Sequence, residues 1–229
     1  MTGMASPRHA APGLRAAVAA IAAVALLPAT LAAVALTTEE IGRLCAGADG
    51  PVDCGRKIET VQLSRLPNLA TRDGATLKVS LYPSGTALFA DVESATGGRY
   101  YTLWDFLDPI NAVIVFTIDG EENTFTLLQR TTGRKFALPA EPKLAPDRQR
   151  LVTADFCETR CVNELAVWRV GRDGVRKELA WKPAETWTDA AAAWKDADTL
   201  TVEYTVAGSA ASKTQERKLD DPRWQRIAP

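Results

Sequence analysis

The chain has 229 residues, with 27 Lys and Arg against 28 Asp and Glu and a formal net charge of −1. This balance leaves no basic stripe, so the sequence lacks the electrostatic footprint of a nucleic-acid-binding protein. The one histidine, His9, stands near the start, and residues 36–229 contain none, which excludes histidine-activated nucleophiles and histidine-bearing metal sites there.

Residues 1–35 have the pattern of a secretory signal peptide. Arg8 and Arg15 precede and flank an uncharged apolar run, residues 16–27, and small residues end the segment at Ala35. We expect cleavage after Ala35. This predicts a periplasmic or secreted protein without stable membrane insertion.

An N-terminal membrane anchor is the alternative for this segment. Residues 16–36 are uncharged and nearly long enough to span a bilayer. Their high alanine content and the presence of Pro28 favour the signal peptide. The rest, residues 36–229, suits one domain, with an N-terminal disulfide loop region over 36–72 and hairpin repeats over 73–229.

The N-terminal region predicts a short helical turn followed by a loop and a strand. Residues 39–46 follow Thr37 and Thr38, either of which suits a helix N-cap. Residues 47–55 (GADGPVDCG) are rich in turn formers and predict a loop. Residues 58–63 (IETVQL) alternate apolar and polar side chains and predict a strand.

From residue 76 onward, short apolar strands alternate with polar turns. Residues 76–82 form the first such strand, and four predicted hairpins follow, which pair 86–92 with 99–106, 111–118 with 124–130, 150–156 with 163–170, and 198–206 with 213–219. No helical pattern of 10 to 15 residues separates them, so a parallel sheet is not expected. Residues 188–197 (TDAAAAWKDA) predict a short helical turn or a loop. The fold class is therefore all-β, with antiparallel hairpins in blade-like or sandwich-like sheets.

Two segments resemble known repeats. Residues 144–154 (LAPDRQRLVTA) are similar to the start of a strand in TolB-type and WD40-like β-propeller repeats, and residues 164–179 resemble the outer strand and turn of such a blade. Arg148 stands where that family prefers glycine, and the chain is too short for a ring of six or seven blades. The resemblance implies blade-like sheets without ring closure. It implies no activity, because propellers are mostly binding platforms.

Four cysteines in an exported chain suggest two disulfides, for which three pairings exist. We favour Cys45–Cys54 and Cys157–Cys161, because each pair brackets a loop with a turn signal. A redox pair or a four-cysteine zinc site is the alternative. The spacing of Cys157 and Cys161 between strands is not that of a redox motif at a helix start, and only this pair has the spacing of a zinc knuckle. We therefore expect no cofactor and no metal.

Three tryptophans fall within 14 residues, namely Trp181, Trp187 and Trp194. One interpretation is core packing, since each indole buries a large area. The other is an aromatic platform on the surface for a sugar, a peptide or a partner protein. The sequence does not decide whether the three rings share a face.

Aspartates occur in pairs at strand ends, namely Asp105 with Asp108, Asp196 with Asp198, and Asp220 with Asp221. Such residues commonly hydrogen-bond the backbone in turns. A glycosidase would need two carboxyl groups that face each other across a cleft. We assign no catalytic residue.

Together these features predict an exported, non-catalytic binding or envelope-associated protein built on β-hairpins. The expected partner is a protein or a glycan of the cell envelope, with no nucleic acid. A structural or assembly factor of the envelope is not distinguishable from this hypothesis by sequence. The alternative from a different class is a carboxylate-dependent hydrolase that acts on a glycan.

Overall fold

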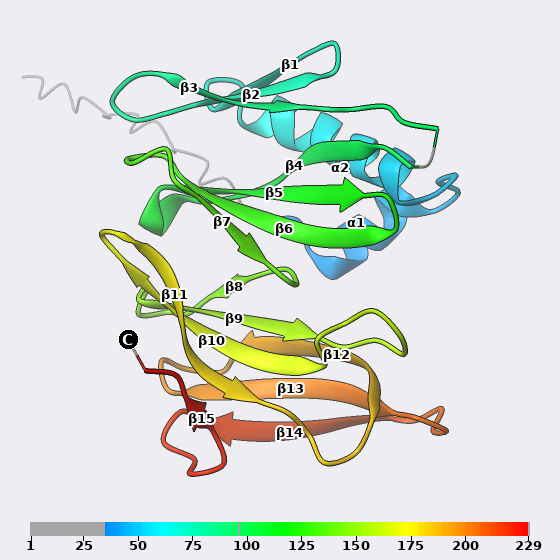
Figure 1. Cartoon of the computed structure of the whole chain (residues 1–229), viewed down its shortest axis with the longest axis vertical. Coiled ribbons are helices and arrows are strands. Elements are labelled where there is room, and N and C mark those ends of the chain that lie inside the picture. Colours follow the sequence, from blue (N-terminus) through cyan, green and yellow to red (C-terminus); the bar gives the residue numbers. More distant parts are fainter. Residues whose placement is uncertain (1–34, 96, 229) are drawn as a thin grey trace, which may run out of the picture. The chain divides into compact units, whose positions relative to one another are not determined.

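The structure, a computed structural model, describes residues 35–95 and 97–228. Within these ranges the chain forms four antiparallel sheets preceded by two α-helices (Figure 1). The predicted all-β class with antiparallel sheets is confirmed. The predicted signal peptide falls on residues that lie, apart from Ala35, outside the described ranges. No helix in the described part of the chain has both the length and the apolar character needed to cross a membrane.

The first helix, α1 (Thr38–Cys45), begins as predicted behind Thr37. The Thr37 hydroxyl accepts a hydrogen bond from the Glu40 amide (3.1 Å), and the Glu40 carboxylate accepts one from the Thr37 amide (2.8 Å). This reciprocal pair is a capping box, which satisfies two amides that the helix itself leaves without acceptors.

The second helix, α2 (Pro51–Arg65), corrects two predictions, because it replaces most of the loop over 47–55 and the whole strand over 58–63. Pro51 occupies the first turn, where its missing N–H costs nothing. The buried face repeats every three or four residues and consists of Gly55, Ile58, Glu59 and Gln62. Two of these four residues are polar and one is glycine, so the sequence does not show the apolar periodicity of an amphipathic helix.

Sheet A contains the strands β1 (Ala70–Asp73), β2 (Thr76–Ser80) and β3 (Thr86–Ala90), in that order. The predicted hairpin of 86–92 with 99–106 is wrong, because β3 pairs with β2, and the backbones of the two predicted segments pair only at the bridge between Val92 and Arg99. Pairing with β2 places the buried side chains of β3 opposite those of β2 and builds one apolar face.

Sheet B contains β4 (Arg99–Leu107), β5 (Ala112–Asp119), β6 (Glu122–Gln129) and β7 (Lys135–Leu138). A 3-10 turn, Asp108–Ile110, joins β4 to β5. The predicted hairpin over β5 and β6 is confirmed by a continuous register between the two strands. β4 is an outer strand of this sheet, and α2 packs against it.

Sheet C has the order β15-β11-β10-β9-β8, and sheet D the order β12-β13-β14. Their strands are β8 (Lys143–Leu144), β9 (Arg150–Asp155), β10 (Glu164–Gly171), β11 (Gly174–Trp181), β12 (Trp187–Trp194), β13 (Thr199–Val206), β14 (Ser212–Lys218) and β15 (Gln225–Arg226). The predicted hairpins of β9 with β10 and of β13 with β14 are confirmed.

The strand β12 corrects the helical turn or loop predicted over 188–197. Its side chains alternate with a period of two, because Ala190, Ala192 and Trp194 pack against the core while Asp189, Ala191 and Ala193 are exposed. Because alanine occupies both the half-buried and the exposed positions, the two sides of the strand differ little in hydrophobicity, and the sequence does not indicate a strand.

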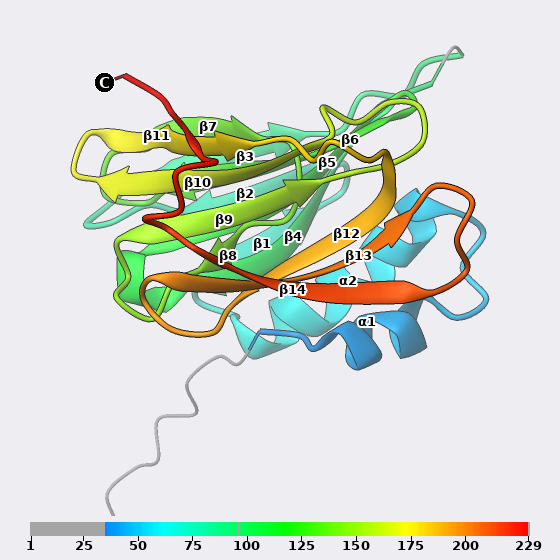
Figure 2. The ribbon, with the colours of Figure 1, turned by 90° about the horizontal axis from the view of Figure 1, so that it is seen from below.

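The four sheets follow one another in chain order (Figure 1), and three hydrophobic clusters join them. The first lies between sheets A and B, the second between B and C, and the third between C and D. After β14 of sheet D the chain crosses back, and β15 pairs with β11 of sheet C (Figures 1 and 2). The expected sheets that face one another are thus present, without a closed barrel. A relation to propeller repeats stays a prediction.

Candidate functional site

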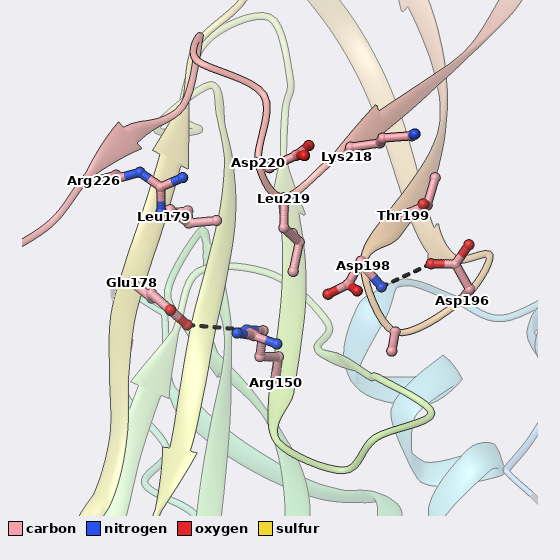
Figure 3. A pocket seen from close by; sticks show the side chains of 11 residues that line it. Arg150, Glu178, Leu179, Asp196, Asp198, Thr199, Lys218, Leu219, Asp220 and Arg226 are labelled. Carbon is pink, nitrogen blue, oxygen red and sulfur yellow. Dashed lines mark hydrogen bonds and ion pairs between the residues drawn. The ribbon is translucent and has the colours of Figure 1, made fainter.

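A pocket of about 670 Å³ opens between sheets C and D (Figure 3). Its floor consists of three buried side chains, Leu179 from β11, Thr199 from β13 and Leu219 from the segment after β14. Their burial follows from the third hydrophobic cluster, to which both leucines belong. Charged side chains form the walls above this floor.

The wall from sheet C is basic. Arg150 of β9 contacts Glu178 of β11 with an Nε–Oε2 distance of 3.2 Å, and it also pairs with Asp147 at 3.4 Å. Arg226 of β15 has no carboxylate within ion-pair distance among the described residues. Arg150 is thus paired with carboxylates, and Arg226 is the arginine of this wall that has no such partner among the described residues.

The wall from sheet D is mainly acidic. It carries Asp196 and Asp198 in the turn between β12 and β13, and Asp220 after β14. The Asp198 amide donates to the Asp196 carboxylate (2.8 Å), which lowers the pKa of Asp196 and fixes the turn. The carboxylate of Asp198 extends toward sheet C in Figure 3. Neither Asp198 nor Asp220 has a cationic partner within the described ranges, and Lys218 lies at the rim.

The pocket therefore places an uncompensated guanidinium opposite two uncompensated carboxylates. Such walls can hold a ligand that carries both an anionic and a cationic group, because each group meets the opposite charge near an apolar floor. No group of three His, Cys, Asp or Glu side chains that could hold a metal ion occurs in the part of the chain that the structure describes.

The structure brings three of the six aspartates named from the sequence, Asp196, Asp198 and Asp220, to this pocket. Asp221 faces elsewhere and pairs with Arg223 (2.6 Å), whose hydrogen bonds lower the pKa of Asp221 to about 2. Asp105 and Asp108 belong to β4 and the 3-10 turn of sheet B, so they do not line the pocket.

Two carboxyl groups have a raised pKa, and neither lines the pocket. Burial raises the pKa of Asp105, and the nearby Glu141 adds to this effect. Burial also raises the pKa of Asp155, whose Oδ2 atom accepts a hydrogen bond from the Val162 amide (2.8 Å). A general acid for glycoside cleavage needs a raised pKa, and the two carboxyl groups with a raised pKa lie outside the pocket.

The three tryptophans singled out in the sequence all belong to the cluster between sheets C and D. Trp187 is only 3% exposed, and its ring stacks on Tyr204 with 3.8 Å between centroids. Trp181 and Trp194 are half-buried, and the Trp194 indole donates to the Lys143 carbonyl (2.9 Å). In this structure Trp187 packs in the core, so the three rings do not form one exposed platform.

Both favoured disulfides are present, and the described residues contain no free cysteine. Cys45–Cys54 joins the end of α1 to the first turn of α2. Cys157–Cys161 closes the connection between β9 and β10, where the Asn163 side chain accepts a hydrogen bond from the Cys157 amide (3.2 Å). Both bonds are local and lie outside the pocket lining.

Sequence reasoning missed the basic wall and the floor of the pocket. Arg150, Glu178 and Arg226 are far apart in the chain, and only the pairing of β9, β11 and β15 through sheet C brings them together. No local motif announces this arrangement. Comparisons with protein-family models, with curated proteins and with solved structures found no match to the chain.

Proposed function

We propose that this chain is an exported, non-catalytic binding protein whose pocket between sheets C and D holds a short peptide or another small zwitterion. The observation that supports this proposal is the opposite charge of the two walls, with Arg226 on one side and Asp198 and Asp220 on the other. The volume, about 670 Å³, lies within the usual range of small-ligand sites.

In the proposed complex, Arg226 binds the carboxylate of the ligand, and Asp198 and Asp220 bind its ammonium group. A guanidinium can donate two parallel hydrogen bonds to a carboxylate, which fixes the ligand's orientation. Leu179 and Leu219 contact the apolar part between the two charged groups. The two disulfides support export, because such bonds persist mainly in oxidising compartments.

A glycan hydrolase remains the competing function, and the geometry supports it less. The pocket gathers four carboxyl groups, from Glu178, Asp196, Asp198 and Asp220. However, the hydrogen bond from the Asp198 amide lowers the pKa of Asp196, whereas a general acid needs a raised value. A binding role requires only the charges themselves.

The first test measures ligand binding by isothermal titration calorimetry on the full chain. The probes are dipeptides with free termini, and the same dipeptides N-acetylated and C-amidated. We expect binding of the free forms only. Arg226→Gln and Asp198→Asn should each weaken it about tenfold, since each removes one charge-assisted contact of about 1.4 kcal/mol.

Matched controls are Arg176→Gln on β11 and Asp189→Asn on β12, both exposed side chains outside the pocket that should leave affinity unchanged. Equal binding of blocked and free dipeptides would contradict the two-charge site. Release of reducing sugar from envelope glycans by the full chain, lost in Asp198→Asn, would replace the binding role with hydrolysis.

A further inference from the structure

The strand β3 is an outer strand of sheet A with an open edge. The Asp91 amide donates to the Ala75 carbonyl (2.8 Å), so the backbone groups of alternate residues up to this point face β2. The N–H and C=O groups of Thr86, Leu88 and Ala90 consequently point away from the sheet. Lys135 Nζ donates a hydrogen bond to the Leu88 carbonyl (3.0 Å) at this edge. Two residues beyond β3, Val92 and Arg99 exchange two backbone hydrogen bonds (2.8 Å each), so the open part of the edge ends at Ala90.

Exposed apolar side chains gather at the same strand. Tyr82 in the turn before β3 is 61% exposed, Leu88 is 56% exposed and Val92 is 55% exposed. They are three of the four exposed large hydrophobic side chains in the described ranges. Leu88, Ala90 and Val92 share one side of the strand, because side chains alternate and Phe89 faces the core.

A cation without a carboxylate partner stands beside this edge. The ammonium of Lys135, on β7, lies 3.7 Å from the centroid of the Phe89 ring and forms no ion pair with the described residues. Partial burial lowers the pKa of Lys135. An ammonium that is partly removed from water gains from an added carboxylate more than a fully solvated one does.

We propose that the open edge of β3 binds an extended segment of a partner protein that carries a carboxylate opposite Lys135. The segment adds a fourth strand to sheet A, and its backbone pairs with Thr86, Leu88 and Ala90. Its alternate side chains cover Leu88. This is strand addition, in which backbone hydrogen bonds give affinity and side chains give selectivity.

A second copy of this chain fits the edge less well. Two β3 strands paired around a twofold axis would bring two Lys135 ammonium groups to one seam, and like charges at such a seam are unfavourable. A segment that carries a carboxylate removes this conflict. The edge lies in sheet A and the pocket between sheets C and D, so either proposal can fail without the other.

The test uses fluorescence anisotropy with the full chain and two labelled octapeptides. In both, valine alternates with threonine and the ends are blocked, and one central threonine is replaced by glutamate in the first peptide and by lysine in the second. We expect the glutamate peptide to bind about tenfold more tightly than the lysine peptide. Lys135→Glu should reverse this order, whereas Lys182→Glu, at an exposed loop position, should not.

Ala90→Pro removes an edge N–H without removing a bond to β2, and proline is tolerated in this position of an outer strand. This substitution should weaken binding of the glutamate peptide about tenfold or more. The matched control is Thr214→Pro on β14, whose N–H also points away from its sheet, because the Leu219 amide donates to the Asp198 carbonyl. Amide exchange at Leu88 and Ala90 should slow when the glutamate peptide is bound.

Three results would overturn the proposal. The first is no binding of either peptide, and the second is binding that Ala90→Pro leaves unchanged. The third is a dimer of the full chain, seen by sedimentation, that Ala90→Pro abolishes, because this would assign the edge to a second copy. Circular dichroism of each variant separates loss of binding from loss of fold.

Discussion

At the scale of single residues, Arg148 has a backbone conformation that favours glycine. It lies in the turn between β8 and β9 with φ of 62°, and its amide donates to the Ala145 carbonyl (2.9 Å). Its side chain is exposed. A left-handed conformation costs a residue other than glycine about 1–2 kcal/mol.

Arg148→Gly should therefore raise the free energy of unfolding by about 0.5–1 kcal/mol, after the extra freedom of glycine in the unfolded chain is subtracted. Urea denaturation measures the change. Arg148→Ala is the matched control, because it removes the same side chain and keeps the strained backbone. If the alanine variant gained as much stability as the glycine variant, backbone strain would not be its source.

At the scale of elements, α2 packs against β4, the outer strand of sheet B, and bonds to its backbone with side chains. The Leu103 amide donates to the Glu59 carboxylate (2.9 Å), and the Trp104 carbonyl accepts a hydrogen bond from Gln62 (2.6 Å). Close approach is required, since a Cβ on Gly55 would lie 2.7 Å from the Thr102 hydroxyl oxygen. Backbone groups at a buried strand edge need such partners, and the helix supplies them.

Glu59 also forms ion pairs with two arginines at this contact. It is 3% exposed and pairs with Arg72 at 2.7 Å and with Arg56 at 3.3 Å. Glu59→Gln leaves both guanidinium groups to Asp91 alone and should lower the free energy of unfolding by about 3 kcal/mol. Chemical denaturation, followed by tryptophan fluorescence, measures this loss.

The control for this prediction lies on the same helix. Asp53 forms an exposed pair with Lys57 (3.1 Å), and Asp53→Asn should change stability far less than Glu59→Gln does, because water already solvates both charges. Similar losses in the two variants would show that the burial of Glu59 does not set the cost.

These contacts explain which elements the sequence could predict. The hairpins β5–β6, β9–β10 and β13–β14 were predictable, because their alternating side chains and short turns are local. The helix α2 was not, because Glu59 and Gln62 face the core to bind backbone groups of a strand some 40 residues away in the chain. The pocket was not, because its basic wall depends on strand order in sheet C.

At the scale of the whole described unit, the stack of sheets ends in a polar face at sheet D. The outward side of this sheet carries exposed residues such as Asp189, Glu203 and Glu216. An antiparallel sheet that faces water on one side carries polar side chains there. Sheet D packs on sheet C through its inner side, so the stability of sheet D depends on the contacts between these two sheets.

The C-terminal segment supplies a large part of that contact. Trp224 is 5% exposed, and its indole donates to the Lys218 carbonyl (2.8 Å). The Arg217 guanidinium carbon lies 3.8 Å from the centroid of the Trp181 ring and 5.6 Å from that of the Trp224 ring. The following residues then pair with β11 of sheet C. The buried Trp224 ring thus contributes to the packing of sheet D on sheet C.

Trp224→Ala should lower the free energy of unfolding by about 3 kcal/mol or more, because it leaves a cavity and removes a cation–π contact from a buried arginine. The loss should be uneven. Hydrogen exchange read by mass spectrometry should show faster exchange over β12, β13 and β14, whereas β5 and β6, which do not touch Trp224, should keep their protection. Gln225→Ala is the control, since it alters an exposed side chain in the same segment. Uniform loss of protection across all four sheets would mean that the unit unfolds as a whole and that Trp224 does not act on sheet D alone.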